Sequence, residues 1–183
     1  MTRTKWRSKA AVAVLAGLIL MAGVADAPAE VVEDGEDLTV RSTDSSVAAV
    51  IERATRESAT FRAMVDTIRA AHGIVYVQPG KCGHGVRSCL VDVVQAGERR
   101  MLWVKVDVRK TDRALMASIG HELRHAIEVL ADPSIKSGPA MVHFYLRTAT
   151  MGAGRAFETP GAILAGDRVH AEIGEFRKRE GER

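Results

Sequence analysis

The spacing of apolar residues changes twice along this chain, and this change is the strongest constraint on its fold. From residue 47 to residue 68, apolar side chains recur at intervals of three and four, which is typical of one face of a helix. Residues 74–108 instead contain three short runs rich in β-branched residues, separated by glycine-containing turns. Helical spacing returns after residue 111. This order predicts an α+β domain with an N-terminal helix, a small sheet and then further helices.

The three runs rich in β-branched residues span residues 74–77, 90–94 and 101–108. In the third run, Leu102, Val104 and Val106 alternate with the intervening residues and therefore share one face of a strand. Since glycine-containing turns separate the runs, we predict that neighbouring strands pair in chain order, as an antiparallel meander.

The helix that follows the strands has clear boundary signals. Thr111 can cap its start, and it extends to about residue 131. Pro133 ends it, because the residue before a proline disfavours the helical backbone. A later helix begins at Gly138-Pro139, and the last helix begins at Thr159-Pro160 and extends through residue 176. Residues 46–183 are thus predicted to form one domain, which is long enough to bury a core.

The N-terminal 29 residues have the layout of a secretory signal peptide. A basic start is followed by an apolar stretch at residues 10–24 and then by small residues, so cleavage after Ala25 or Ala29 is expected. The stretch is shorter than the roughly 20 residues of a typical membrane span. We therefore predict a secreted or periplasmic protein with no stable membrane span after cleavage; an uncleaved anchor is the alternative. The acidic residues 30–45 predict a flexible leader.

The excess of positive charge belongs to the predicted signal peptide. The chain has 26 Lys and Arg against 23 Asp and Glu, and residues 1–29 contain four of the bases and one of the acids. The mature part is therefore close to neutral, and its charge indicates no nucleic-acid partner.

Two cysteines, Cys82 and Cys89, lie in the predicted mature part. In an oxidising compartment an even pair favours a disulfide, and closing this loop would contribute about 2–3 kcal/mol in the chain-entropy model. Free thiols are one alternative. A small metal site formed with His84 is another, although it lacks a clear fourth ligand.

The chemistry of the chain is concentrated in the stretch SIGHELRHA, residues 118–126. His121 and His125 are four residues apart, so on a helix both imidazoles point from one face and can bind one tetrahedral ion. Glu122 is rotated by about 100° from His121 and can stand beside the ion without binding it. A zinc-bound water has a pKa near about 7, and Glu122 could take its proton as general base.

SIGHELRHA, placed after a sheet and before further helices, resembles the active-site helix of zincin metallopeptidases. The resemblance implies a zincin-like fold in which His121 and His125 bind zinc and Glu122 is the general base. It also implies that the last strand before the helix, residues 101–108, lies at the edge of the cleft and pairs with extended substrate. Arg124 departs from the strictest form of the family signature, which disfavours a charged residue at that position.

The third metal ligand is implied by the same resemblance. Zincins of the glutamate-ligand type (gluzincins) use a carboxylate from a following helix, and FETPGAILAGDRVHAE resembles such a helix with Glu158 at its entrance. Glu172 is an alternative, but it lies roughly 20 Å further along the same helix, so both cannot bind one ion. His143 and His170 are further candidates. Asp167 could orient a ligand histidine or be a plain surface acid, and Tyr145 could polarise an intermediate or belong to the core.

These features together predict an exported zinc-dependent metallopeptidase that hydrolyses peptide bonds in a peptide or protein substrate. Two other functions remain open at the level of sequence. One is a non-catalytic, zinc-containing module. The other is a metal-free secreted binding domain held by a Cys82–Cys89 disulfide.

Overall fold

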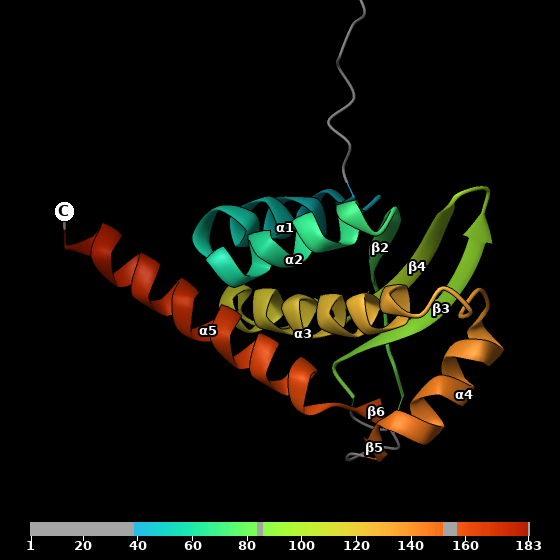
Figure 1. Ribbon diagram of the computed structural model, residues 1–183. Coiled ribbons are helices and arrows are strands. Elements are labelled where there is room, and N and C mark those ends of the chain that lie inside the picture. Colours follow the sequence, from blue (N-terminus) through green and yellow to red (C-terminus); the bar gives the residue numbers. More distant parts are fainter. Residues whose placement is uncertain (1–38, 84–85, 152–156, 183) are drawn as a thin grey trace, which may run out of the picture. The chain divides into compact units, whose positions relative to one another are not determined.

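A computed structural model describes residues 39–83, 86–151 and 157–182 of the chain. Within these ranges the protein is α+β, with five helices, a four-stranded sheet and a short separate strand pair (Figure 1). The predicted signal peptide, residues 1–29, and His84 lie outside the described residues. None of the described helices combines the length and the apolarity that crossing a membrane requires.

The main sheet has the strand order β1-β2-β4-β3. Its strands are β1 (Val40–Arg41), β2 (Gly73–Pro79), β3 (Ser88–Ala96) and β4 (Arg99–Val106). Strands β1 and β2 are parallel, β2 and β4 are parallel, and β3 runs antiparallel to β4. The predicted antiparallel pairing of the last two runs is confirmed by β3 and β4. The complete antiparallel meander is wrong, because β4 lies between β2 and β3 and is parallel to β2.

Burial explains why β4 is an inner strand. Leu102, Val104 and Val106 are fully buried, whereas Val91 and Val94 of β3 are exposed. An inner strand pairs on both sides, and its buried face is covered by α3; the more exposed β3 is left at the edge. The prediction that residues 101–108 form the edge of the cleft is therefore also wrong.

Strand β1 lies within the segment predicted to be a flexible leader. Thr39 and Val40 are buried, and Val40 is in register with Val75 of β2. Residues 39–45 are therefore part of the fold, contrary to the prediction for residues 30–45.

The N-terminal helical region forms two helices, α1 (Ser45–Glu57) and α2 (Ala59–Ala70), where the apolar spacing had predicted one. Asp44 caps α1 by accepting hydrogen bonds from the backbone N–H groups of Ser46 and Val47. The break is at Ser58, whose extended backbone and side chain cap α2 by accepting from the N–H of Phe61. A serine at the junction thus begins the second helix.

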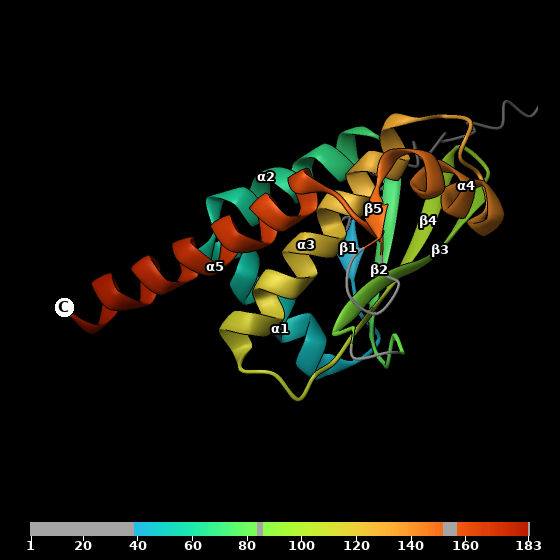
Figure 2. The same cartoon turned by 90° about the horizontal axis from the view of Figure 1, so that it is seen from below.

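Helix α3 (Asp112–Ala131) confirms the predicted boundaries and lies between α5 and the sheet (Figure 2). Its fully buried residues include Met116, Ile119 and Leu123. At its C-terminal end, the buried guanidinium of Arg100 donates hydrogen bonds to the backbone carbonyls of Val129, Leu130, Asp132 and Ile135. Strand β4 therefore holds the end of the helix that carries the HExxH stretch.

The chain continues through α4 (Gly138–Thr148), the antiparallel pair β5 (Thr150–Met151) and β6 (Phe157–Glu158), and α5 (Pro160–Gly181). Helix α5 is longer than predicted, because the closing basic residues continue it. Two glycines permit its close approach to α3. A Cβ at position 120 would lie 2.8 Å from Val169, and one at position 166 would lie 3.3 Å from the backbone of Ala117. This contact brings the start of α5 next to His121.

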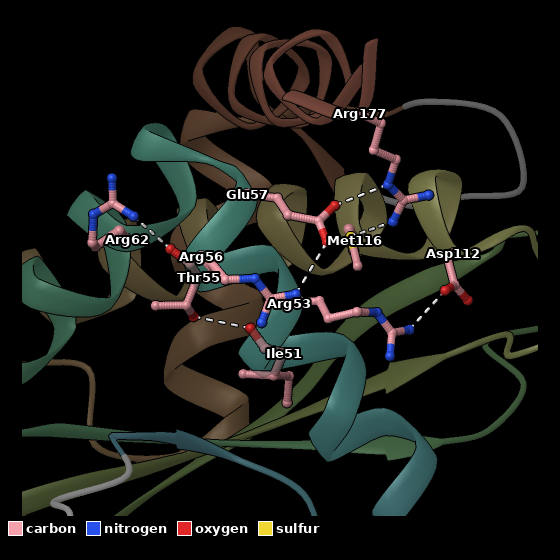
Figure 3. A network of polar contacts seen from close by, with 9 residues as sticks. All are labelled: Ile51, Arg53, Thr55, Arg56, Glu57, Arg62, Asp112, Met116 and Arg177. Carbon is pink, nitrogen blue, oxygen red and sulfur yellow. Dashed lines mark hydrogen bonds and ion pairs between the residues drawn. The ribbon is translucent and has the colours of Figure 1, made fainter. Parts of the chain in front are cut away.

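An ion pair between a buried acid and an exposed arginine ties the first helix to the last one (Figure 3). Glu57 of α1 is buried and accepts a hydrogen bond of 2.9 Å from Nε of Arg177 on α5. The same guanidinium lies 3.8 Å from the sulfur of Met116 on α3. The guanidinium of Arg177 thus joins the three helices at the edge of the core.

Candidate metal centre

The structure brings together the three residues predicted to bind metal. One ligand atom each from His121, His125 and Glu158 lies within 4.8 Å of the others. The two histidines come from the middle of α3, and Glu158 comes from β6, directly before α5. Nε2 of His121 lies 3.2 Å from Oε2 of Glu158. Ligand atoms about 2.0–2.1 Å from a tetrahedral zinc ion are about 3.3 Å apart, so this separation fits a shared ion.

The tautomer of His125 also fits a metal ligand. Its Nδ1 lies 3.0 Å from Oε2 of Glu128. Because an ionised carboxylate only accepts hydrogen bonds, Nδ1 carries the proton and Nε2 keeps its lone pair. Nε2 is buried and has no hydrogen-bond partner among the described residues. An unpartnered buried acceptor is costly, and binding a cation would satisfy it.

The ring of His121 is also held by a hydrogen bond, in this case to α5. Its ring hydrogen-bonds the backbone carbonyl of Ala162 on α5. Burial, with repulsion from His125 adding to it, lowers the pKa of His121 to about 4, so the imidazole is neutral near pH 7. Burial also raises the pKa of Glu158. Both shifts disfavour a charged His121–Glu158 pair, so this contact is not a stabilising salt bridge. A metal ion would instead bind the neutral imidazole and the carboxylate, which are the forms that ligands require.

Glu122 lies beside the ligand atoms and is held against the edge strand. It is 3% exposed, and it accepts hydrogen bonds from the Ser88 side chain and the backbone N–H of Leu90. Burial raises the pKa of Glu122 to about 7. The register of β3 shifts between Leu90 and Asp92, which places a bulge at the height of the site. The edge strand, rather than β4, therefore contacts the predicted general base.

Glu128, which no sequence pattern singled out, also belongs to the candidate site. Besides His125, it contacts Thr159, whose hydroxyl donates to Oε1 over 2.8 Å, and Arg124, whose Nε lies 3.5 Å from the same oxygen. Burial opposes its ionisation, yet the hydrogen bonds from His125 and Thr159 hold the pKa of Glu128 below its usual value. Arg124, the departure from the family signature, thus lies beside the carboxylate that orients His125. The spacing of three between His125 and Glu128 on one helix was the available signal.

Removing the Glu128 carboxylate should weaken metal binding without unfolding the protein. Glu128→Gln is expected to lower zinc affinity by about 10–100-fold, because an amide fixes the proton on His125 Nδ1 less firmly. Competition with a chromophoric chelator measures this affinity. Glu175→Gln, at an exposed position on α5, is the control and should bind zinc as the unchanged protein does. Equal affinities of the two variants would contradict the orienting role.

The alternative ligands lie elsewhere. Glu172 accepts hydrogen bonds from Ser58 and Thr60 at the start of α2. His143 is exposed on α4 and contacts Arg147, and His170 contacts Arg113. None of these three residues belongs to the group around His121, because each already serves another part of the surface.

Other singled-out residues have structural roles. The Tyr145 hydroxyl is buried and donates to the backbone carbonyl of His125 over 2.9 Å, which makes this residue part of the core under the site. Thr159 caps α5, as predicted, by accepting from the N–H of Ala162. Cys82 and Cys89 form the predicted disulfide, which excludes a metal site built from their thiolates. Asp167 lines a cavity next to the site without contacting either ligand histidine in the described structure.

A cavity of about 220 Å³ opens at the three ligand residues. Its walls are mainly apolar and include Leu90 and Val91 of β3, Met141 and Val142 of α4, and Phe157. The arrangement combines two imidazoles, the carboxyl group of Glu158 and the buried carboxyl group of Glu122 at the mouth of the pocket. It has the components for metal-assisted hydrolysis. No family model, curated protein or solved structure matches this chain.

Proposed function

We propose that this chain is an exported zinc-dependent metallopeptidase, in which His121, His125 and Glu158 bind the ion and Glu122 is the general base. The observation that carries the proposal is the buried Nε2 of His125, which has no partner among the described residues, in a group where His121, His125 and Glu158 each have a ligand atom within 4.8 Å of the others. Two nitrogen ligands and one carboxylate are the donor set of many catalytic zinc sites.

A zincin-like fold is part of the proposal. In its support, the HExxH stretch lies mid-helix on α3, and the carboxylate ligand comes from a later element. An antiparallel edge strand, β3, lies next to the motif glutamate on an otherwise parallel sheet. The disulfide between Cys82 and Cys89 is in keeping with export to an oxidising compartment.

Glu122 would perform the proton transfers of the reaction. A zinc ion supplies a Lewis acid that polarises the substrate carbonyl and acidifies water. The Glu122 carboxylate, held by Ser88 and the N–H of Leu90, can take a proton from the attacking water and deliver it to the leaving amine. A pKa near neutrality suits both steps, because the group must gain and lose the same proton.

The proposal is tested by the metal content of the protein after removal of the predicted signal peptide. Elemental analysis should find about one zinc ion per chain, and chelation should lower the melting temperature, since the ion binds the folded state. His121→Ala and His125→Ala should each lose the ion. His143→Ala, at an exposed position outside the site, is the matched control and should retain it.

The outcomes separate the proposed function from its rivals. A folded sample that contains no ion and does not respond to chelators would leave a metal-free binding domain. A sample that contains zinc and hydrolyses no member of a broad peptide library would instead be a non-catalytic zinc module.

A further inference from the structure

A second cavity, of about 640 Å³, also borders the candidate metal centre. Residues of α3, residues of α5 and the segment 86–88 line it. It shares His121, Glu122 and Glu158 with the apolar cavity described above. A substrate whose reacting bond lies at these residues would therefore extend into both cavities.

Two cations, Arg87 and Lys110, stand in the wall of this second cavity. Both also line an adjoining cavity of about 690 Å³, so they lie where the two spaces meet. The ammonium group of Lys110 contacts the hydroxyl of Ser118, a neutral partner. Among the residues that the structure describes, neither cation forms an ion pair. Their charges are therefore free to bind a ligand.

The acids of the adjoining cavity compensate these charges only in part, although Asp107 attracts Lys110. Asp107, the acid in the adjoining cavity, is bound by Arg109 through Nε at 2.8 Å and a terminal nitrogen at 2.7 Å. Lys81 adds a further positive charge to the same lining. The second cavity also contains three acids, Glu122, Glu158 and Asp167, and Glu122 attracts Lys110. The excess of positive charge thus lies in the adjoining cavity, which begins at Arg87 and Lys110, in a molecule whose mature part is close to neutral.

The two cations are also close enough to repel each other. Burial lowers the pKa of Lys110, and repulsion from Arg87 lowers it further. An anion bound between two such groups relieves this repulsion and gains charge-assisted hydrogen bonds from both.

We propose that Arg87 and Lys110 form a subsite for a carboxylate of the substrate, next to the reacting bond. The subsite deepens the proposed function, on which its description as a substrate site rests. On this proposal, the peptidase prefers substrates that carry a negative charge on the Lys110 side of the reacting bond. The same substrates place an apolar group in the smaller cavity. The carboxylate can belong to an Asp or Glu side chain or to the free C-terminus of a short peptide.

Binding to a protein that cannot turn over its substrate tests the subsite without relying on activity. Fluorescence anisotropy would compare zinc-loaded Glu122→Gln protein with N-acetylated peptide libraries that carry Glu, Gln or Lys at one position, each with a free or an amidated C-terminus. Peptides with the added carboxylate should bind about tenfold tighter than neutral ones. This advantage should shrink as salt screens the charges. A preference among amidated peptides identifies a side chain, and one confined to free acids identifies the C-terminus.

Variants show whether the named residues cause the preference. Arg87→Gln and Lys110→Gln should each reduce the advantage of the carboxylate, and Lys110→Glu should favour the Lys library instead. Lys178→Gln, an exposed cation on the last turns of α5, is the control and should change nothing. Equal binding of all libraries, or a preference that survives replacement of both cations, overturns the subsite.

The subsite and the proposed function fail in different ways. Hydrolysis without any charge preference would remove the subsite and leave the peptidase. Charge-dependent binding by a protein that hydrolyses nothing would leave the anion site and remove the peptidase.

Discussion

Replacing Glu122 with glutamine should leave the zinc ion bound and reduce peptide hydrolysis by about 10²–10⁴-fold. Glutamine has the same shape, and its amide oxygen can still accept from the N–H of Leu90, but it cannot take a proton. The buried carboxylate has a raised pKa, so its ionisation opposes folding above its ordinary pKa, and this cost increases as the pH rises toward about 7 and then levels off. The variant should therefore melt no lower than the unchanged protein near neutral pH.

Three measurements on Glu122→Gln are needed together: kcat/KM, zinc content and melting temperature. Glu98→Gln, at an exposed position between β3 and β4, serves as the control and should match the unchanged protein in all three. Hydrolysis that persists in Glu122→Gln with bound zinc would contradict the assigned base. A loss of zinc would show that Glu122 contributes to binding the ion, which the arrangement of ligands does not predict.

Replacing Arg100 with methionine should destabilise the whole domain by about 2–4 kcal/mol. Arg100 is buried, and its guanidinium donates to four backbone carbonyls at the end of α3 and just beyond it. Methionine fills similar space and leaves these acceptors without a donor in a place that water reaches poorly. Lysine keeps the charge but lacks the planar group that reaches several acceptors, so Arg100→Lys should fall between the two.

Urea unfolding of the metal-free protein measures this effect without a contribution from zinc. Arg99→Met is the matched control, since its position is adjacent and exposed, and it should change the free energy of unfolding by less than about 0.5 kcal/mol. An Arg100→Met midpoint equal to that of Arg99→Met would show that the carbonyls find other donors and that Arg100 does not hold the helix end.

Several features of the site could be predicted because their signals are local. Thr111 and Pro133 limit the helix that carries SIGHELRHA, and the spacing of four places both imidazoles on one face. The preference for Glu158 came from the resemblance to gluzincins, and the distance along the chain showed only that Glu158 and Glu172 cannot both bind one ion. The disulfide followed from the number and spacing of the cysteines. Whether the site binds zinc and cleaves peptides stays a prediction.

The partners of the ligand residues could not be predicted in the same way. Glu128 orients His125, and Thr159, 31 residues further along the chain, bonds the same carboxylate. Glu172 looked like a ligand candidate, yet it binds the start of α2, more than 110 residues before it. A carboxylate on a helix has the same local sequence signals in either role. Only the packing of α5 on α2 and α3 decides which donors it meets.

The sequence alone determined the type of each main element. It also determined that the two imidazoles and the acid lie on one helix, because helix periodicity, caps and short spacings act within a few residues. The tertiary structure alone decided the order of the strands, with β4 inside and β3 at the edge beside Glu122. Strand pairing is set by which faces become buried when distant segments meet. The sequence gives no sign of the role of Gly120 and Gly166, which is to permit the close approach of α5 to α3. A close approach depends on both helices together.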